Sequence, residues 1–143
     1  MTPKLFLPFF AASLLLSQPA KHATHIDRAK LDAAYPKHSV LLDHGAYRVM
    51  AIGREKPGEA EVHENHTDVL YFVDGTATLI TGGTLKNGKS SAPGEIRGTG
   101  VDGGESRNLK AGDVIVVPNT VPHQFVNVHG PLDYFVIKVR SAQ

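Results

Sequence analysis

Short runs of β-branched and aromatic residues, separated by glycine, proline and asparagine, constrain the fold of this 143-residue chain more than any other feature. From Ser39 onward these runs follow the two-residue period of strands, and no helical period follows Pro36. Many short strands at close spacing predict an all-β fold with antiparallel pairing, in a sandwich or a barrel. We expect strands at residues 40–43, 47–54, 60–64, 69–73, 76–81, 106–109, 114–117, 123–128 and 134–140.

The first 38 residues have a different pattern. Lys4 and an apolar run over residues 5–16 are followed by small and polar residues. The run is shorter than the roughly 20 residues of a membrane span, so it predicts a signal peptide rather than a span. We expect a signal peptide at residues 1–20, cleaved between 17 and 23, and export to the periplasm or the exterior. A buried or membrane-lying helix is the alternative.

Residues 21–38 are expected to form an N-terminal arm, and residues 39–143 a single β-domain. The arm would hold a short helix that Thr24 caps and Pro36 ends.

Residues 82–104 are rich in glycine, serine and charge and hold few apolar anchors. This composition predicts a solvated loop or a long hairpin, which could cover a pocket as a lid or rim. Ile96 and Val101 could form a weak strand within it. We expect the charged side chains of this segment, Arg97 among them, to be solvated rather than to bind a substrate.

The composition excludes several classes of function. The chain has no cysteine, so a disulfide, a cysteine-bound zinc and a thiol nucleophile are impossible. Its formal net charge of +1 argues against a nucleic-acid partner, which needs a basic surface. Neither a phosphate-binding loop nor a dinucleotide-binding fingerprint is present.

Two clusters of polar residues could carry chemistry. The first spans residues 61–68 and combines two histidines with several carboxylates. In the second, the apolar run 114–117, which we expect to be a buried strand, leads through a turn bounded by prolines to His123. Imidazole and carboxylate groups together suit a first-row divalent ion. Solvated polar residues at turns are the alternative.

The spacing in both clusters resembles the two motifs of the cupin superfamily. In the second motif, glycine, proline, histidine and asparagine occupy matching positions, with threonine where a second glycine is usual: Gly112, Pro118, Thr120, His123 and Asn127. In the first, an acid and a glycine are correctly spaced, and Glu-x-His replaces the usual His-x-His: Glu61, His63, Asp68 and Gly75. The resemblance covers about residues 45–140, and the family usually has glutamate where Asp68 stands.

This resemblance implies a small single-domain cupin of the type-2 kind, with a jelly-roll β-barrel and a central pocket. It also implies one divalent transition metal, which could be iron, manganese, zinc, nickel or copper. By motif position its ligands would be His63, Asp68 and His123, with Glu61 in the fourth place. His66 is an alternative fourth ligand, because it lies in the same cluster.

Three functions are compatible with this pattern. The first is a metal-dependent enzyme that acts on a small organic molecule, with dioxygenase-like chemistry preferred over isomerase or lyase chemistry. The second is a non-catalytic module that binds a small ligand, and the third is an interaction protein with the barrel as scaffold. No catalytic residue is assigned. A homodimer formed through the arm at residues 24–36 is also expected.

Overall fold

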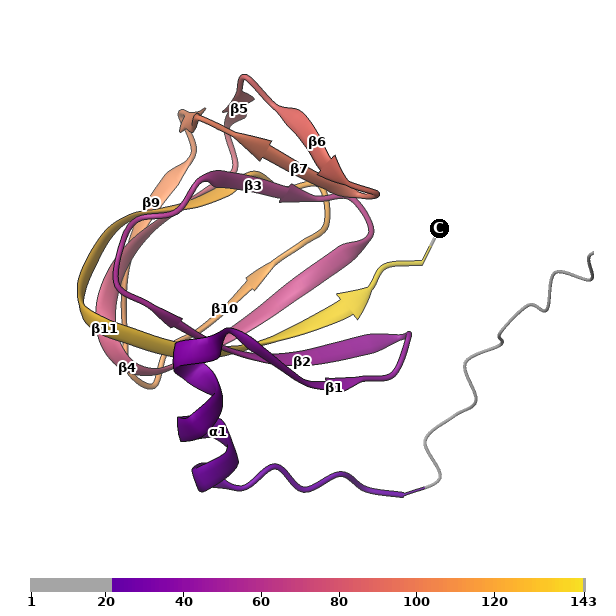
Figure 1. The fold of residues 1–143 in the computed structure, drawn as a ribbon. Coiled ribbons are helices and arrows are strands. Elements are labelled where there is room, and N and C mark those ends of the chain that lie inside the picture. Colours follow the sequence, from indigo (N-terminus) through magenta and orange to yellow (C-terminus); the bar gives the residue numbers. More distant parts are fainter. Residues whose placement is uncertain (1–21, 143) are drawn as a thin grey trace, which may run out of the picture.

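Two long strands, β4 (His66–Thr81) and β11 (His123–Arg140), organise the described part of the chain, residues 22–142 of a computed structural model. They pair antiparallel along nearly their whole length. The first half of β11 pairs with the second half of β4, and the second half of β11 pairs with the first half of β4. The sheet curls around these strands into a jelly-roll β-barrel (Figure 1), so the all-β prediction is confirmed.

The other strands extend this pair on both sides. In the first half of the chain they are β1 (Ser39–Asp43), β2 (Tyr47–Arg54) and β3 (Ala60–His63). In the second half they are β5 (Thr84–Lys86), β6 (Lys89–Ala92), β7 (Glu95–Gly98), β8 (Gly100–Asp102), β9 (Glu105–Lys110) and β10 (Val114–Val117). The main sheet runs in the order β1-β2-β11-β3-β7-β6, while β9 and β10 pair with β4, and β5 pairs with β8.

The predicted strand breaks at Gly75 and Gly130 are bends within continuous strands. Gly75 has a φ of 79°, in the left-handed region that glycine tolerates best. A Cβ atom at this position would overlap the backbone of Pro131 on β11. A glycine there lets β4 bend while it stays paired with β11, whose register shifts between His129 and Asp133. The predicted strands 69–73 and 76–81 are therefore one bent strand, β4, and the predicted strands 123–128 and 134–140 are another, β11.

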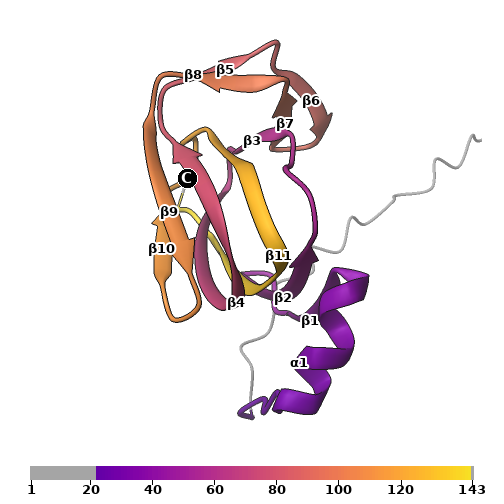
Figure 2. The ribbon, with the colours of Figure 1, turned by 90° about the vertical axis from the view of Figure 1, so that its left-hand side faces the viewer.

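The segment 82–104 is not a solvated loop, because it forms four short strands. Its strands β5 to β8 lie at one end of the barrel, next to β3 (Figures 1 and 2). The strand β7 pairs with β3 in register from Ala60↔Gly98 to His63↔Glu95. Four residues of this segment line the cavity, as the alternative of a pocket rim predicts: Ser91, Ala92, Glu95 and Arg97.

The strand β10 differs from the prediction of a buried strand. Val117 is buried, but Val114 and Val116 are 58% and 55% exposed. The reason is that β10 pairs only with β4, so it is an edge strand with one face turned outward.

The N-terminal arm contains the helix α1 (Arg28–Ala34) and a 3-10 turn at Tyr35–Lys37, and it lies outside the barrel beside β1 and β2 (Figure 2). The predicted cap at Thr24 is wrong, because Asp27 caps the helix and accepts a hydrogen bond from the Lys30 amide at 2.8 Å. Ala34 and Tyr35 are buried against Ala51 of β2, which fixes the arm to the barrel. The predicted signal peptide at residues 1–20 lies outside the described residues.

Among residues 22–142, no helix has the length and apolar character that crossing a bilayer requires.

Three aromatic rings form the centre of the barrel core. Phe72 on β4 is fully buried and contacts Phe125 and Tyr134, both on β11, at ring-centroid distances of 6.2 and 5.5 Å. The rings of Phe125 and Tyr134 lie 5.5 Å apart. Because both of these residues also line the cavity, the core supports the pocket wall directly.

We predict that Phe72→Ala lowers the free energy of unfolding by about 3–5 kcal/mol, since it removes a buried ring and leaves a void between two others. Chemical denaturation followed by circular dichroism measures this change. The control is Val40→Ala, at a half-exposed position on β1, which should cost less than about 1 kcal/mol. Equal losses for both variants would contradict this account of the core.

The turn between β10 and β11 contains a strained residue. Thr120, at the position where the cupin motif has glycine, has a φ of 66°. This region disfavours β-branched side chains by about 1–2 kcal/mol. The Thr120 amide donates to the His63 carbonyl at 2.8 Å, so the turn is fastened to the strand that carries His63.

We predict that Thr120→Gly raises the free energy of unfolding by about 0.5–1 kcal/mol, because relief of strain exceeds the entropy cost of glycine. Thr120→Val keeps the branched Cβ and should give no gain. Thermal and urea unfolding of both variants measure the difference. A Thr120→Gly variant less stable than the wild type would show that the threonine is not strained here.

Candidate metal centre

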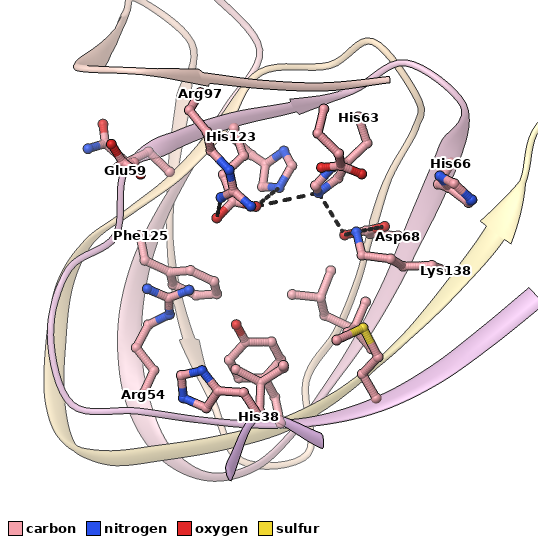
Figure 3. Close-up of a pocket in the computed structure, with 18 of the residues that line it drawn as sticks. His38, Arg54, Glu59, His63, His66, Asp68, Arg97, His123, Phe125 and Lys138 are labelled. Carbon is pink, nitrogen blue, oxygen red and sulfur yellow. Dashed lines mark hydrogen bonds and ion pairs between the residues drawn. The ribbon is translucent and has the colours of Figure 1, made fainter. Parts of the chain in front are cut away.

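Strand pairing brings three predicted ligands together at one end of the cavity. His123, the first residue of β11, pairs with Glu61 of β3, and His63 lies two residues further along β3 on the same face. The Glu61 Oε2 atom lies 3.5 Å from His63 Nε2 and 4.0 Å from His123 Nε2. One ligand atom from each of these residues falls within 4.8 Å of the other two (Figure 3). Both histidines are buried.

Hydrogen bonds orient both imidazole rings. His63 Nδ1 donates to the Glu95 carboxylate at 2.5 Å, and His123 Nδ1 donates to the Val121 carbonyl at 3.2 Å. Because each Nδ1 is engaged, each ring would offer the lone pair of Nε2 to a metal ion in its neutral form. Such partners fix the tautomer and orientation of metal-binding histidines in general.

The strand β7 supplies a second layer beneath these ligands. Glu95 lies opposite His63 and Arg97 lies opposite Glu61 in the β3–β7 ladder. Arg97 forms an ion pair with Glu61 Oε1, which leaves Oε2 of the same carboxylate facing the histidines. The expectation that Arg97 is a solvated loop charge holds only in part, because its side chain is 36% exposed but lies on β7 and pairs with Glu61.

Asp68 lies against the same histidine but has a cation of its own. Its Oδ2 atom is 3.3 Å from His63 Nε2, and Lys138 Nζ donates to both of its oxygens at 2.9 Å. Lys138 on β11 is the cross-strand partner of Asp68 on β4, and both side chains are largely buried. The Asp68 carboxylate thus lies next to the predicted metal centre, and Lys138 neutralises its negative charge.

His66, the predicted alternative ligand, lines the cavity beside Asp68 and Lys138 (Figure 3). The compact group of ligand atoms found among the described residues does not include it.

The environment shifts the pKa values of the two central histidines in opposite directions. Burial acts to lower the pKa of His63, but the hydrogen bond with Asp68 and the charges of Asp68 and Glu95 outweigh it, so this pKa is raised. Burial lowers the pKa of His123 and favours its neutral, metal-binding form.

The neighbours of these histidines are shifted downward. Burial acts to raise the pKa of Asp68, but the hydrogen bond with His63 and the charge of Lys138 lower it overall. The pKa of His66 is lowered, first by burial and then by the charge of Lys138.

The donor set fits a divalent metal ion. Two imidazole nitrogens and one carboxylate oxygen are the ligands of the facial triads that hold non-haem iron, and they also suit zinc and manganese. Ligand atoms bound to a metal at about 2.1 Å lie roughly 3 Å from one another. Glu61 Oε2 lies 3.5 Å from His63 Nε2 and 4.0 Å from His123 Nε2, so these two distances would have to shorten by up to about 1 Å when a metal binds.

The charge of the surroundings also favours a cation. Three carboxylates and two cations surround the rings, so these five groups carry one net negative charge when ionised: Glu61, Asp68, Glu95, Arg97 and Lys138.

The centre opens into a cavity of about 460 Å³ whose walls are mainly apolar. Leu70, Phe125, Tyr134 and Val136 line it together with the charged groups. A cavity of this volume accommodates a small organic molecule next to the candidate ligands.

Sequence reasoning found the three convergent residues but missed the residues that support them. Glu95, Arg97 and Lys138 lie 32, 36 and 70 positions from their respective partners along the chain. The only local signal was the alternation of Glu95, Ile96 and Arg97, which is typical of a strand with two charges on one face.

The sequence matches no protein-family model and no curated protein. Several solved structures are similar in fold. The hydroquinone 1,2-dioxygenase in complex with Cd²⁺ and 4-hydroxybenzonitrile matches with a TM-score of 0.54, 15% identity, and coverage of 71% of this chain and 63% of that chain. A Ralstonia eutropha protein proposed to be a mannose-6-phosphate isomerase matches with a TM-score of 0.50, 17% identity, and coverage of 71% and 82%.

A cupin-2 domain protein from Shewanella frigidimarina matches with a TM-score of 0.49, 16% identity, and coverage of 71% and 78%. At such low identity these likenesses concern the fold. The two likenesses with TM-scores of 0.50 and 0.54 agree with the curled antiparallel barrel. The chain thus shares the curled antiparallel β-barrel fold of the dioxygenase and of the Ralstonia protein.

Proposed function

We propose that this protein is an exported, metal-dependent enzyme that acts on a small organic molecule within the barrel. His63, His123 and Glu61 would hold one divalent transition metal, with Asp68 as the candidate fourth ligand. Dioxygenase-like chemistry is the first choice, and isomerase or lyase chemistry is the second.

The convergence of two Nε2 atoms on one carboxylate oxygen carries this proposal. Separate hydrogen bonds from Nδ1 hold both rings in the same tautomer, and Arg97 holds the far oxygen of Glu61. A solvated polar cluster would not require that two buried histidines and a half-buried glutamate be oriented toward one point.

A metal held by His63, His123 and Glu61 would supply a Lewis acid beside the cavity. The protein's own groups would then position the organic molecule against the apolar wall of Leu70, Phe125 and Val136 and exclude water from it. The fold likeness to a dioxygenase whose structure holds Cd²⁺ and an aromatic molecule supports this choice.

The metal's identity would narrow the reaction, because iron directs assays to oxygen uptake and zinc directs them to isomerisation or lyase chemistry. A non-catalytic module that binds a small ligand in the same cavity is the alternative. Export and the homodimer stay predictions.

We predict that the metal-free protein binds one equivalent of at least one ion among iron(II), manganese, zinc, nickel and copper. His63→Ala and His123→Ala should each weaken binding by more than about 100-fold, since each removes one of three donors. Equilibrium dialysis with elemental analysis measures both quantities. His129→Ala, on the same strand as His123 but exposed, is the matched control and should bind like the wild type.

Binding of none of these ions by the wild type would contradict the proposal. So would binding that both histidine variants retain unchanged.

We also predict that Glu95→Ala weakens metal binding by about 10–100-fold, because His63 loses the partner that fixes its ring. Glu95→Gln keeps an acceptor for Nδ1–H and should lose less. The control is Glu105→Ala, which removes a carboxylate that pairs with Arg107 on β9. If Glu95→Ala binds metal as tightly as the control, Glu95 does not orient His63.

A further inference from the structure

A second polar group faces the cavity across from the candidate metal centre. Arg54, the last residue of β2, extends its guanidinium along the cavity wall opposite His63 and His123 (Figure 3). Its central carbon lies 5.0 Å from the centre of the Phe125 ring, in a cation–π arrangement. The guanidinium also faces the hydroxyl of Tyr134, whose pKa is raised chiefly by burial, so that this hydroxyl stays protonated.

Arg54 differs from the other long cationic side chains that line the cavity. Arg48 pairs with Asp43, Arg97 with Glu61, and Lys138 with Asp68. Within residues 22–142, no carboxylate lies at ion-pair distance from Arg54. Its Nε atom is buried and has no hydrogen-bond partner there. A buried donor without an acceptor is costly, so an acceptor on a bound molecule would stabilise this side chain.

The backbone is shaped around this guanidinium. A Cβ atom built on Gly58 would lie 2.5 Å from Arg54 Nη1 and 3.3 Å from the central guanidinium carbon. Gly58 is fastened to β11, since its amide donates to the Phe125 carbonyl at 3.1 Å and its carbonyl accepts from Gln124 Nε2 at 3.0 Å. The glycine therefore leaves room for the guanidinium while the wall behind it is held in place.

We infer that Arg54 binds the carboxylate of a small organic acid whose apolar body lies against Phe125 and Tyr134 and whose other end reaches the candidate metal centre. Guanidinium and carboxylate match in a two-bond geometry, and the Tyr134 hydroxyl supplies a further donor. This assignment rests on the proposed function, because it names the class of molecule that the same cavity takes.

The surroundings favour a monocarboxylate over a phosphate. A phosphate dianion needs several cations or backbone amides around it. Arg54 is a single unpaired cation, and the wall beside it is aromatic. One negative charge carried on an apolar body matches both features.

The test uses benzoate as the probe and benzamide as its neutral isostere, with metal-free full-length protein, so that no metal competes for the carboxylate. Chemical-shift changes in protein NMR spectra report binding. We expect benzoate to bind with a dissociation constant in the millimolar range, and benzamide to bind about tenfold more weakly.

Arg54→Gln should weaken benzoate binding about tenfold and abolish the preference over benzamide. Gly58→Ala should weaken it as well, because the added methyl group displaces the guanidinium while its charge remains. The matched control is Arg48→Gln, an arginine of the same cavity whose carboxylate partner is Asp43, and it should change binding less than twofold. Circular dichroism confirms that each variant is folded.

Three results would overturn the inference: no benzoate binding to the wild type, equal binding of benzoate and benzamide, or benzoate binding that Arg54→Gln leaves unchanged. Metal binding is measured on the same samples, so the two proposals can fail separately. Metal binding without Arg54-dependent benzoate binding would contradict the carboxylate subsite and still support the metal centre. Arg54-dependent benzoate binding without any metal binding would support the carboxylate subsite and contradict the proposal of a metal-dependent enzyme.

Discussion

The arrangement of this cavity depends on two hydrogen bonds, one at each histidine Nδ1. Glu95 accepts from His63, and the Val121 carbonyl accepts from His123. Each bond engages Nδ1 of its ring, and both Nε2 atoms face Glu61. If either ring were flipped, its Nε2 atom would no longer face Glu61. The set of candidate metal ligands would then lose one nitrogen.

The fold supplies these bonds through strand pairing. The β3–β7 ladder places Glu95 opposite His63 and Arg97 opposite Glu61, so one short strand supports two adjacent ligands. The turn before β11 supports the third, because the Val121 carbonyl and His123 Nδ1 are only two residues apart. The same turn accommodates a strained Thr120, whose amide holds the His63 carbonyl. Strain at this turn is thus coupled to the position of both histidines.

The sequence predicted the features that depend on residues close together in the chain. Alternating apolar residues predicted most strands, and motif spacing predicted Glu61, His63 and His123, because their separations follow from strand period and turn length. The roles of Glu95, Arg97 and Lys138 depend on which strands pair and in what register, and no local pattern encodes that. The bends at Gly75 and Gly130 could not be predicted for the same reason. A glycine of this kind ends a strand unless the pairing continues beyond it, and the pairing of β4 with β11 does continue.

The proposed centre requires that the Nε2 atoms of His63 and His123 bind one metal ion while their Nδ1 atoms stay protonated. Long-range ¹⁵N–¹H NMR spectra of histidine side chains, recorded before and after one equivalent of zinc is added, test it most directly. We expect that zinc shifts the Nε2 signals of these two residues and that both Nδ1 atoms carry the proton afterwards. Zinc on Nδ1 of either ring, or spectra that zinc leaves unchanged, would contradict it.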